Sequence, residues 1–297
     1  MNTEQENFRT EMEPSETEKE AAKERVLAEI AELDIGLNLE KHPEILDRLA
    51  EIGHHFRDGL DMARVIQTLY GQFRESLGLR DASPKRLMRT AVLHDIGKSG
   101  PAGEKTDFHQ AVRCLFREPT RPFNPFSQGK PTTVTAFIES QEMPESESIR
   151  ETLRRNGIDP DRESAIEFWR RHVGWSYDIL KNERWDGEAV DDDMITIAGS
   201  HHILEGKNPA ELNIGNEPQG EDDLELIEMT GLLAAVDKYQ AFRHRANLDH
   251  AETMRRLRGM FESHPELPDM TKEKFKVVLD ILDRSGPELK DCCRTAN

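Results

Sequence analysis

The sequence predicts an all-α protein, and three observations lead to this class. Apolar residues recur every three or four positions in successive segments, which is the period of an amphipathic helix. Residues that favour helix ends, such as Ser15, Gly78 and Pro84, stand at the boundaries of those segments. Apolar and polar residues alternate over no useful length, so we expect no substantial β-sheet.

Composition and charge narrow the class further. The 297 residues, 36% of them hydrophobic and 33% charged, suffice for one large domain or two small ones with a heavily charged surface. The net charge of −18 disfavours nucleic-acid polymers and acidic membranes as partners, but it is compatible with a local basic pocket for a small phosphate. No signal peptide, membrane-spanning run or CxxC pair is recognisable, so we expect a cytoplasmic protein.

The N-terminal region is predicted to be an acidic tail followed by one helix. Residues 1–14 are polar and without periodicity, which is typical of a disordered segment. Ser15 and Glu18 form a capping-box pattern that opens a helix ending near Leu33. Its narrow apolar stripe indicates packing on the core, and a homodimer contact is the alternative interpretation.

The same periodicity and capping signals predict eight further helices. They are expected at residues 43–52, 60–77, 84–95, 163–180, 191–202, 221–242, 249–261 and 271–282. Residues 99–162 are less regular, because two Pro-rich patches flank a modest apolar segment at 132–138. We interpret this stretch as an insertion, either a lid over a pocket or a plain surface excursion.

Candidate metal ligands recur at or near the ends of these helices. The first two are adjacent, because the apolar helix that begins at Pro84 ends in His94 and Asp95, and Lys98 comes three residues after Asp95. The complete set is His94, Asp95, His172, His201, His202 and Asp237. Imidazole and carboxylate ligands together suit Fe, Mn or Zn, and six of them can hold two ions with Asp95 as a bridge. Two such ions polarise a phosphoryl oxygen and acidify a bound water.

Each of these residues alone is weak evidence for a metal. A lone histidine within an amphipathic helix, such as His172, is more often a hydrogen-bonded core residue than a ligand. Asp237 is less ordinary, because a carboxylate beside the apolar segment MTGLLAAV costs free energy unless it is paired or metal-bound. The recurrence of such residues in several helices indicates a site.

These segments resemble the HD superfamily of metal-dependent phosphohydrolases, and within it the HD-GYP cyclic di-GMP phosphodiesterases. Leu93–Lys98 reads LHDIGK, which is the central motif of the family. His172 with Ser176 resembles its next helix, and the pair His201-His202 resembles its His-His motif. The segment from Ala234 to Ala241, followed by Arg245, resembles its closing motif.

The resemblance implies an HD-type helical bundle that hydrolyses a small phosphorylated or nucleotide-like substrate. Asp95 and Lys98 would be catalytic, and Lys98 and Arg245 would bind the phosphate. It also implies a domain organisation: an N-terminal extension, a metal-binding domain interrupted by the insertion, and a short tail. The boundaries are 1–42, 43–285 and 286–297, with the insertion at about 99–162.

Two departures from the family pattern bear on the site. The family has a histidine near the start of its first core helix, where this chain has Asp61. The seventh ligand is therefore Asp61, or alternatively His55, which with Glu51 has the Glu/His spacing of trinuclear members. The Gly-Tyr-Pro signature is also absent from residues 203–209, which read ILEGKNP.

Two other functions stay open. A similar scaffold carries the di-iron oxygenases related to inositol oxygenase, which also have a lysine three residues after the aspartate; the extra histidine of the His201-His202 pair favours the phosphohydrolase. A degenerate member that binds a nucleotide or a partner protein without catalysis is the other alternative. The nearly complete set of ligands argues against it.

Overall fold

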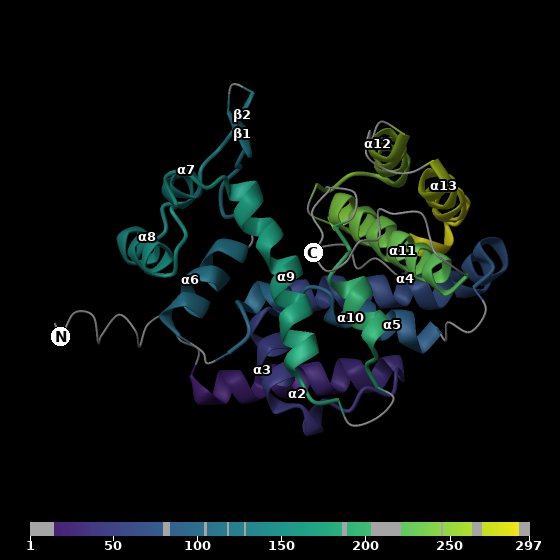
Figure 1. The fold of residues 1–297 in the computed structure, drawn as a ribbon, viewed down its shortest axis with the longest axis horizontal. Coiled ribbons are helices and arrows are strands. Elements are labelled where there is room, and N and C mark those ends of the chain that lie inside the picture. Colours follow the sequence, from purple (N-terminus) through teal and green to yellow (C-terminus); the bar gives the residue numbers. More distant parts are fainter. Residues whose placement is uncertain are drawn as a thin grey trace.

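The computed structural model describes residues 15–79, 84–103, 106–117, 119–127, 129–185, 189–202, 221–244, 246–262 and 269–290. Within these ranges the chain is all-α, which confirms the predicted class (Figure 1). The helices are α2 (Glu16–Leu33), α3 (Pro43–Glu51), α4 (Gly53–Leu77), α5 (Pro84–Leu93), α6 (Asp107–Phe116), α7 (Val134–Ser140), α8 (Ser146–Arg155), α9 (Ala165–Asn182), α10 (Asp192–Ala198), α11 (Glu221–His244), α12 (His250–Glu262) and α13 (Asp269–Arg284). Short elements are the 3₁₀ helices η1 (Leu39–Lys41), η2 (Ile96–Ser99) and η4 (Glu288–Lys290), and the antiparallel strands β1 (Phe126–Ser127) and β2 (Lys130–Pro131).

The N-terminal helix begins and packs as its sequence indicates. The Ser15 amide donates to the Glu18 carboxylate at 2.7 Å while the Ser15 hydroxyl accepts from the Glu18 amide, so the capping box is formed. Val26, Ile30 and Leu33 are buried, and α2 packs on α3. The apolar stripe therefore faces the core of this chain. Residues 1–14 lie outside the described residues.

Helices α4 and α5 form the centre of the fold, and α11 and α13 also pack on α4 (Figure 1). Gly59 lets α4 approach α5 closely, because a Cβ at this position would lie 2.7 Å from the Ala91 carbonyl oxygen. The apolar residues of α5 before and after Ala91, from Leu87 to Leu93, are buried. The last turn of α5, which His94 and Asp95 follow, is thereby packed against α4. Helix α5 ends at Leu93, two residues earlier than expected, and His94 and Asp95 form the turn that follows it.

The prediction for α4 was wrong at its start. We expected one helix over residues 43–52 and the long helix to begin at Leu60, but α4 begins at Gly53. The His55 amide donates to the Ile52 carbonyl at 2.8 Å, so the first turn forms without a side-chain cap. His55 and Phe56 are buried, and this packing outweighs the weak helix propensity of the local sequence.

Residues 99–162 contain more regular structure than their sequence suggested. Helices α6, α7 and α8 fold there and lie together on one side of α9 (Figure 1). They form a second hydrophobic cluster with the first half of α9, which is separate from the main core. Its aromatic centre includes Phe137 and Trp169, whose ring centroids are 5.2 Å apart. The insertion thus has a core of its own and shares one long helix with the rest of the chain.

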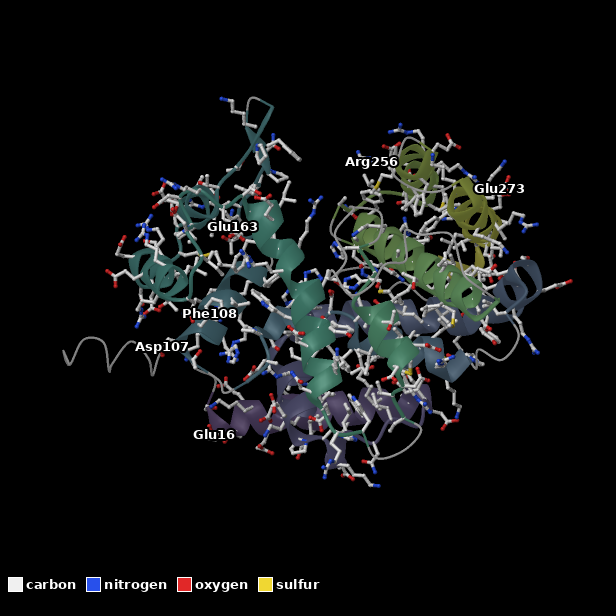
Figure 2. The ribbon with its side chains drawn as sticks, viewed as in Figure 1. Glu16, Asp107, Phe108, Glu163, Arg256 and Glu273 are labelled. Carbon is white, nitrogen blue, oxygen red and sulfur yellow. The ribbon has the colours of Figure 1, made fainter. Side chains whose placement is uncertain are left out.

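Charged side chains cover the outside of the molecule (Figure 2). The side chains of three of the residues that Figure 2 labels, Glu16, Arg256 and Glu273, are exposed to solvent. Within the described ranges, every helix is too short or too polar to span a bilayer.

Candidate metal centre

The turn that follows α5 brings His94 and Asp95 against the middle of α9. The Ser176 hydroxyl of α9 donates to the His94 carbonyl oxygen at 2.6 Å and accepts from the Gly97 amide at 2.9 Å. A Cβ at Gly97 would lie 2.1 Å from the His172 carbonyl oxygen, so only glycine fits here. This contact fixes the position of the His94-Asp95 turn relative to His172.

Three buried histidines are oriented in the same way. His94 contacts the Ala91 carbonyl oxygen through Nδ1 at 2.7 Å, His172 the Trp169 oxygen at 2.5 Å, and His201 the Ala198 oxygen at 2.6 Å. A carbonyl oxygen only accepts, so each Nδ1 must carry the proton. In the neutral imidazole the lone pair then lies on Nε2. Metal-ligating histidines are held by the same kind of hydrogen bond.

The Nε2 atoms converge on the carboxylate of Asp95. Oδ2 lies 3.4 Å from Nε2 of His94, whereas Oδ1 lies 3.0 Å from Nε2 of His172 and 3.7 Å from Nε2 of His201. The two oxygens of one carboxylate therefore face different histidines. This is the arrangement that a carboxylate bridging two ions requires.

Asp237 comes to the same place from α11. Its Oδ1 lies 3.8 Å from Nε2 of His94, and its Oδ2 accepts from the Lys238 ammonium group at 3.1 Å. Burial would raise the pKa of Asp237, but Lys238 and His94 outweigh burial and hold that pKa well below its usual range. The carboxylate is therefore ionised and available to a cation.

The charges of His172, His201 and Asp95 also suit a cation, whereas His94 differs from them. Burial lowers the pKa of His172, and burial together with the neighbouring imidazoles lowers the pKa of His201 well below its usual value, so both are neutral at pH 7. Burial would raise the pKa of Asp95, but His94 and Lys98 hold it well below its usual range. For His94, burial would lower the pKa, yet the adjoining Asp95 and Asp237 raise it.

The spacing of the possible ligand atoms fits that of ligands around one metal ion. Two overlapping groups have all their ligand atoms within 4.8 Å of one another: His172, His201 and His202, and His94, Asp95 and His201. Nε2 of His172 and Nε2 of His201 are 3.2 Å apart. Two nitrogen ligands of one ion, each about 2.0–2.1 Å from it, are separated by roughly 3 Å. Among the described residues, the fully buried Nε2 of His94 has no hydrogen-bond partner, which a cation would supply.

Lys98 is buried beside this cluster. Its ammonium group contacts Oδ2 of Asp95, and it donates to Nδ1 of His55 at 3.2 Å. Nε2 of His55 lies 2.8 Å from the carbonyl oxygen of Phe116 at the end of α6. Lys98 therefore lies at the cluster, whereas His55, the alternative seventh ligand, reaches the cluster through Lys98.

Asp61, the other candidate for the seventh ligand, has different neighbours. It accepts from Arg64 at 2.9 Å, and its Oδ2 lies 3.9 Å from Nδ1 of His244. Neither Asp61 nor His55 belongs to the two ligand groups found among the described residues. We had not singled out His244, although it stands seven residues after Asp237 and hence on the same face of α11.

Two of the sequence-based expectations fall outside the described part of the chain. Arg245, the second expected phosphate ligand, is one of them. Residues 203–209, where the Gly-Tyr-Pro signature would stand, are the other.

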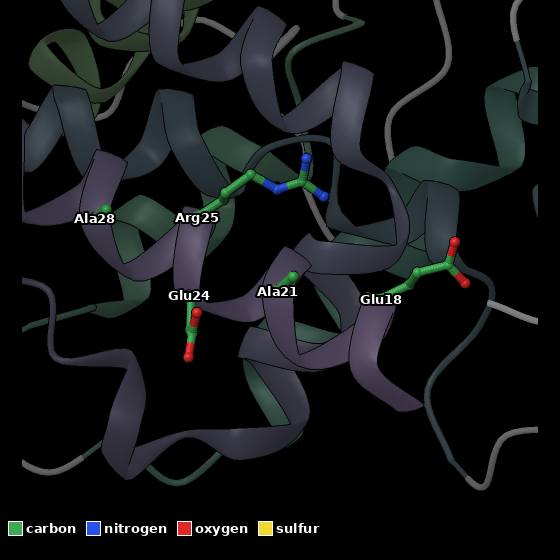
Figure 3. A pocket seen from close by; sticks show the side chains of 5 residues that line it. All are labelled: Glu18, Ala21, Glu24, Arg25 and Ala28. Carbon is green, nitrogen blue, oxygen red and sulfur yellow. The ribbon is translucent and has the colours of Figure 1, made fainter. Parts of the chain in front are cut away.

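An open hollow on α2 is unrelated to this cluster (Figure 3). It is lined by Glu18, Ala21, Glu24, Arg25 and Ala28, all from one helix. Two carboxylates, an arginine and two alanines on one solvated helix face suggest no chemistry.

Comparison with known proteins adds no relative: no family model, no curated protein and no solved structure matches the chain. The site is therefore interpreted from its geometry and from its motifs.

Proposed function

We propose that this protein is a metal-dependent phosphohydrolase of the HD type that cleaves a phosphate ester in a nucleotide-like substrate. One observation carries the proposal. The Nε2 atoms of His94, His172 and His201 converge on the two oxygens of Asp95, while each Nδ1 is committed to a backbone carbonyl. Buried polar atoms with unused lone pairs are unfavourable unless a cation or a proton joins them.

The donors divide into two sets that share Asp95. One ion would be held by His94, Asp95 and Asp237, and the other by Asp95, His172, His201 and His202. His201 also lies within reach of His94 and Asp95, so it could serve either ion. Nitrogen and carboxylate donors of this kind suit iron, manganese or zinc. Two such ions would supply polarisation of the phosphoryl oxygen, and they would lower the pKa of the attacking water so that it can lose its proton at neutral pH.

The protein itself supplies positive charge for an anionic substrate. Lys98 is only 5% exposed and lies beside the Asp95 carboxylate, and Lys238 lies beside Asp237. In a chain with a net charge of −18, local ammonium groups are what would attract a phosphate. We propose that Lys98 contacts the phosphate, and we retain Arg245 as a second candidate because of the family resemblance.

The test is to measure metal content and hydrolysis on the same preparation, purified without a chelator. We expect about two ions of iron, manganese or zinc per chain. We also expect hydrolysis of bis(p-nitrophenyl) phosphate that is lost on chelation and restored by metal. Assays of cyclic dinucleotides and of nucleoside monophosphates would then define the substrate.

Two other results would replace this proposal. Two irons per chain with oxygen consumption and no hydrolysis would assign the protein to the di-iron oxygenases. The absence of any bound metal, with none taken up when it is added, would make it a non-catalytic binding module.

A further inference from the structure

We propose that His55 is a positioning residue that orients Lys98 toward Asp95 and joins the metal centre to the inserted helix α6. The proposal rests on the proposed function, because it assigns a role within that site. Its basis is a continuous series of contacts. The Phe116 carbonyl oxygen is 2.8 Å from Nε2 of His55, Nδ1 of His55 is 3.2 Å from the Lys98 ammonium nitrogen, and Lys98 contacts Asp95.

The direction of each hydrogen bond follows from its partners. The Phe116 carbonyl oxygen can only accept, so Nε2 of His55 carries the proton. A lysine ammonium group can only donate, so Nδ1 of His55 offers its lone pair to Lys98. His55 is therefore neutral, with a defined tautomer, and both of its ring nitrogens are engaged. This explains how a buried histidine so close to the cluster can serve the site without being a ligand.

Helix α6 is fastened to the same region by two further contacts. Arg113 of α6 pairs with Glu51 at 2.6 Å, and Glu51 stands four residues before His55. The ring of Phe116 packs edge-on against His55 and against His172, with centroid distances of 6.4 and 5.6 Å. The Glu51 and His55 side chains, which have the spacing of a metal-binding pair, instead hold the end of α6 against the metal centre.

The consequence concerns the orientation of Lys98. A buried ammonium group with three protons needs several acceptors, and here Asp95 and His55 are two of them. Without His55, Lys98 would lose a neutral acceptor and would be free to turn away from its present direction. The positive charge that a phosphate needs would then be poorly placed, although the metal ligands themselves would be unchanged.

The experiment compares His55→Phe with His55→Gln. Phenylalanine keeps the ring but removes both polar contacts, whereas glutamine offers an amide N–H to Phe116 and an amide oxygen to Lys98. For His55→Phe we expect kcat/KM for bis(p-nitrophenyl) phosphate to fall roughly ten- to a hundredfold with unchanged metal content. For His55→Gln we expect most of that activity to return.

Two controls separate positioning from stability. His42→Phe removes another buried histidine. Its Nδ1 lies 2.8 Å from the Glu183 carboxylate and it does not contact the cluster, so kcat/KM should be unchanged. In a Lys98→Met background, His55→Phe should cause no further loss, because the two residues act through one contact. Additive losses, loss of metal in His55→Phe, or failure of glutamine to restore activity would overturn the proposal.

A measurement without substrate keeps this inference distinct from the proposed function. Nitrogen-15 NMR of the histidine side chains should show the His55 proton on Nε2, and Lys98→Met should shift the Nδ1 resonance. If the wild-type protein hydrolyses no phosphate ester, the proposed function fails, while this measurement still decides whether His55 is held by Lys98 and Phe116. A proton on Nδ1 of His55 would refute the arrangement.

Discussion

Gly97 and Ser176 lie in direct contact, with the Gly97 amide donating to the Ser176 hydroxyl at 2.9 Å. The same hydroxyl donates to the carbonyl oxygen of His94, so one side chain of α9 binds the turn at both of its ends. His172 is one helical turn before Ser176. The relative positions of the His94-Asp95 turn and His172 are therefore set by a backbone contact that no larger residue than glycine permits.

We expect Gly97→Ala to destabilise the protein by about 1–3 kcal/mol or more, because its Cβ would overlap the His172 carbonyl oxygen. Urea unfolding of the two proteins measures the difference. Gly174→Ala is the matched control, since it stands in α9 with no atom within 4 Å of the added Cβ. That substitution should stabilise by about 0.5–1 kcal/mol. Equal effects at the two glycines would contradict the close contact.

Arg48→Met should destabilise by about 3 kcal/mol, because two buried and two partly buried acceptors lose their donor at once. The Arg48 guanidinium, 1% exposed, donates to the Ser99 hydroxyl at 3.0 Å and to the carbonyl oxygens of Gly100, Pro101 and Gly103. It thereby fixes the loop that follows Lys98. The midpoint of thermal unfolding is the measurement.

Arg255→Met is the control for Arg48, because its side chain is 70% exposed and pairs with Glu252 on the surface. It should leave the thermal midpoint unchanged. If both arginine variants had the same thermal midpoint as the wild-type protein, the buried network around Arg48 would have no role in stability.

Protonation of His109 should weaken the fold at mildly acidic pH. Burial lowers the pKa of His109 below its usual value of about 6.5. Its Nδ1 accepts from the Thr106 amide at 3.1 Å, and Nε2 donates to the Pro101 carbonyl at 2.9 Å, so the neutral form is the one that fits. As pH falls, His109 takes up a proton in the unfolded chain before it does so in the folded protein. Its contribution to the free energy of unfolding is therefore complete above the unfolded pKa, and it is lost as pH falls from that pKa through the lower folded pKa.

The measurement is the free energy of unfolding at pH 7.5 and at pH 5.5. Glutamine at position 109 offers the same donor and acceptor without titrating, so His109→Gln should lose less stability over this range than the wild-type protein. Parallel losses in the two proteins would show that His109 does not titrate with folding.

Removing Asp95 should remove most of the bound metal. In Asp95→Ala the carboxylate whose two oxygens face His94 and His172 is gone, and with it the group that both ions would share in the proposed assignment. Metal per chain can be measured after dialysis, with circular dichroism to verify the fold. His42→Ala is the control, because that histidine contacts Glu183 and should leave the metal content unaltered. Wild-type metal content in Asp95→Ala would exclude this cluster as the site.

Much of the helical structure followed from the sequence by itself, because the signals are local. The Ser15–Glu18 capping box, the stripe of Val26 and Ile30, and the Gly78 cap act within one or two helical turns. The same holds for the expectation that an apolar helix ends at His94 and Asp95, which places the end of α5 within two residues of Leu93. The weaker signals of α6, α7 and α8 were hidden by prolines between them, and packing on α9 decides that these helices form.

Only the tertiary structure decided which of the singled-out residues meet. His94, His172, His201 and Asp237 come from four separate parts of the chain, and their distances depend on how α5, α9, α10 and α11 pack. A sequence shows the kind of each ligand and its place on its own helix. Side-chain direction between elements depends on long-range contacts, as with His55, which packing turns toward Lys98 and Phe116. The sequence therefore determined the candidate donors, and the packing of the helices determined which of them face one another.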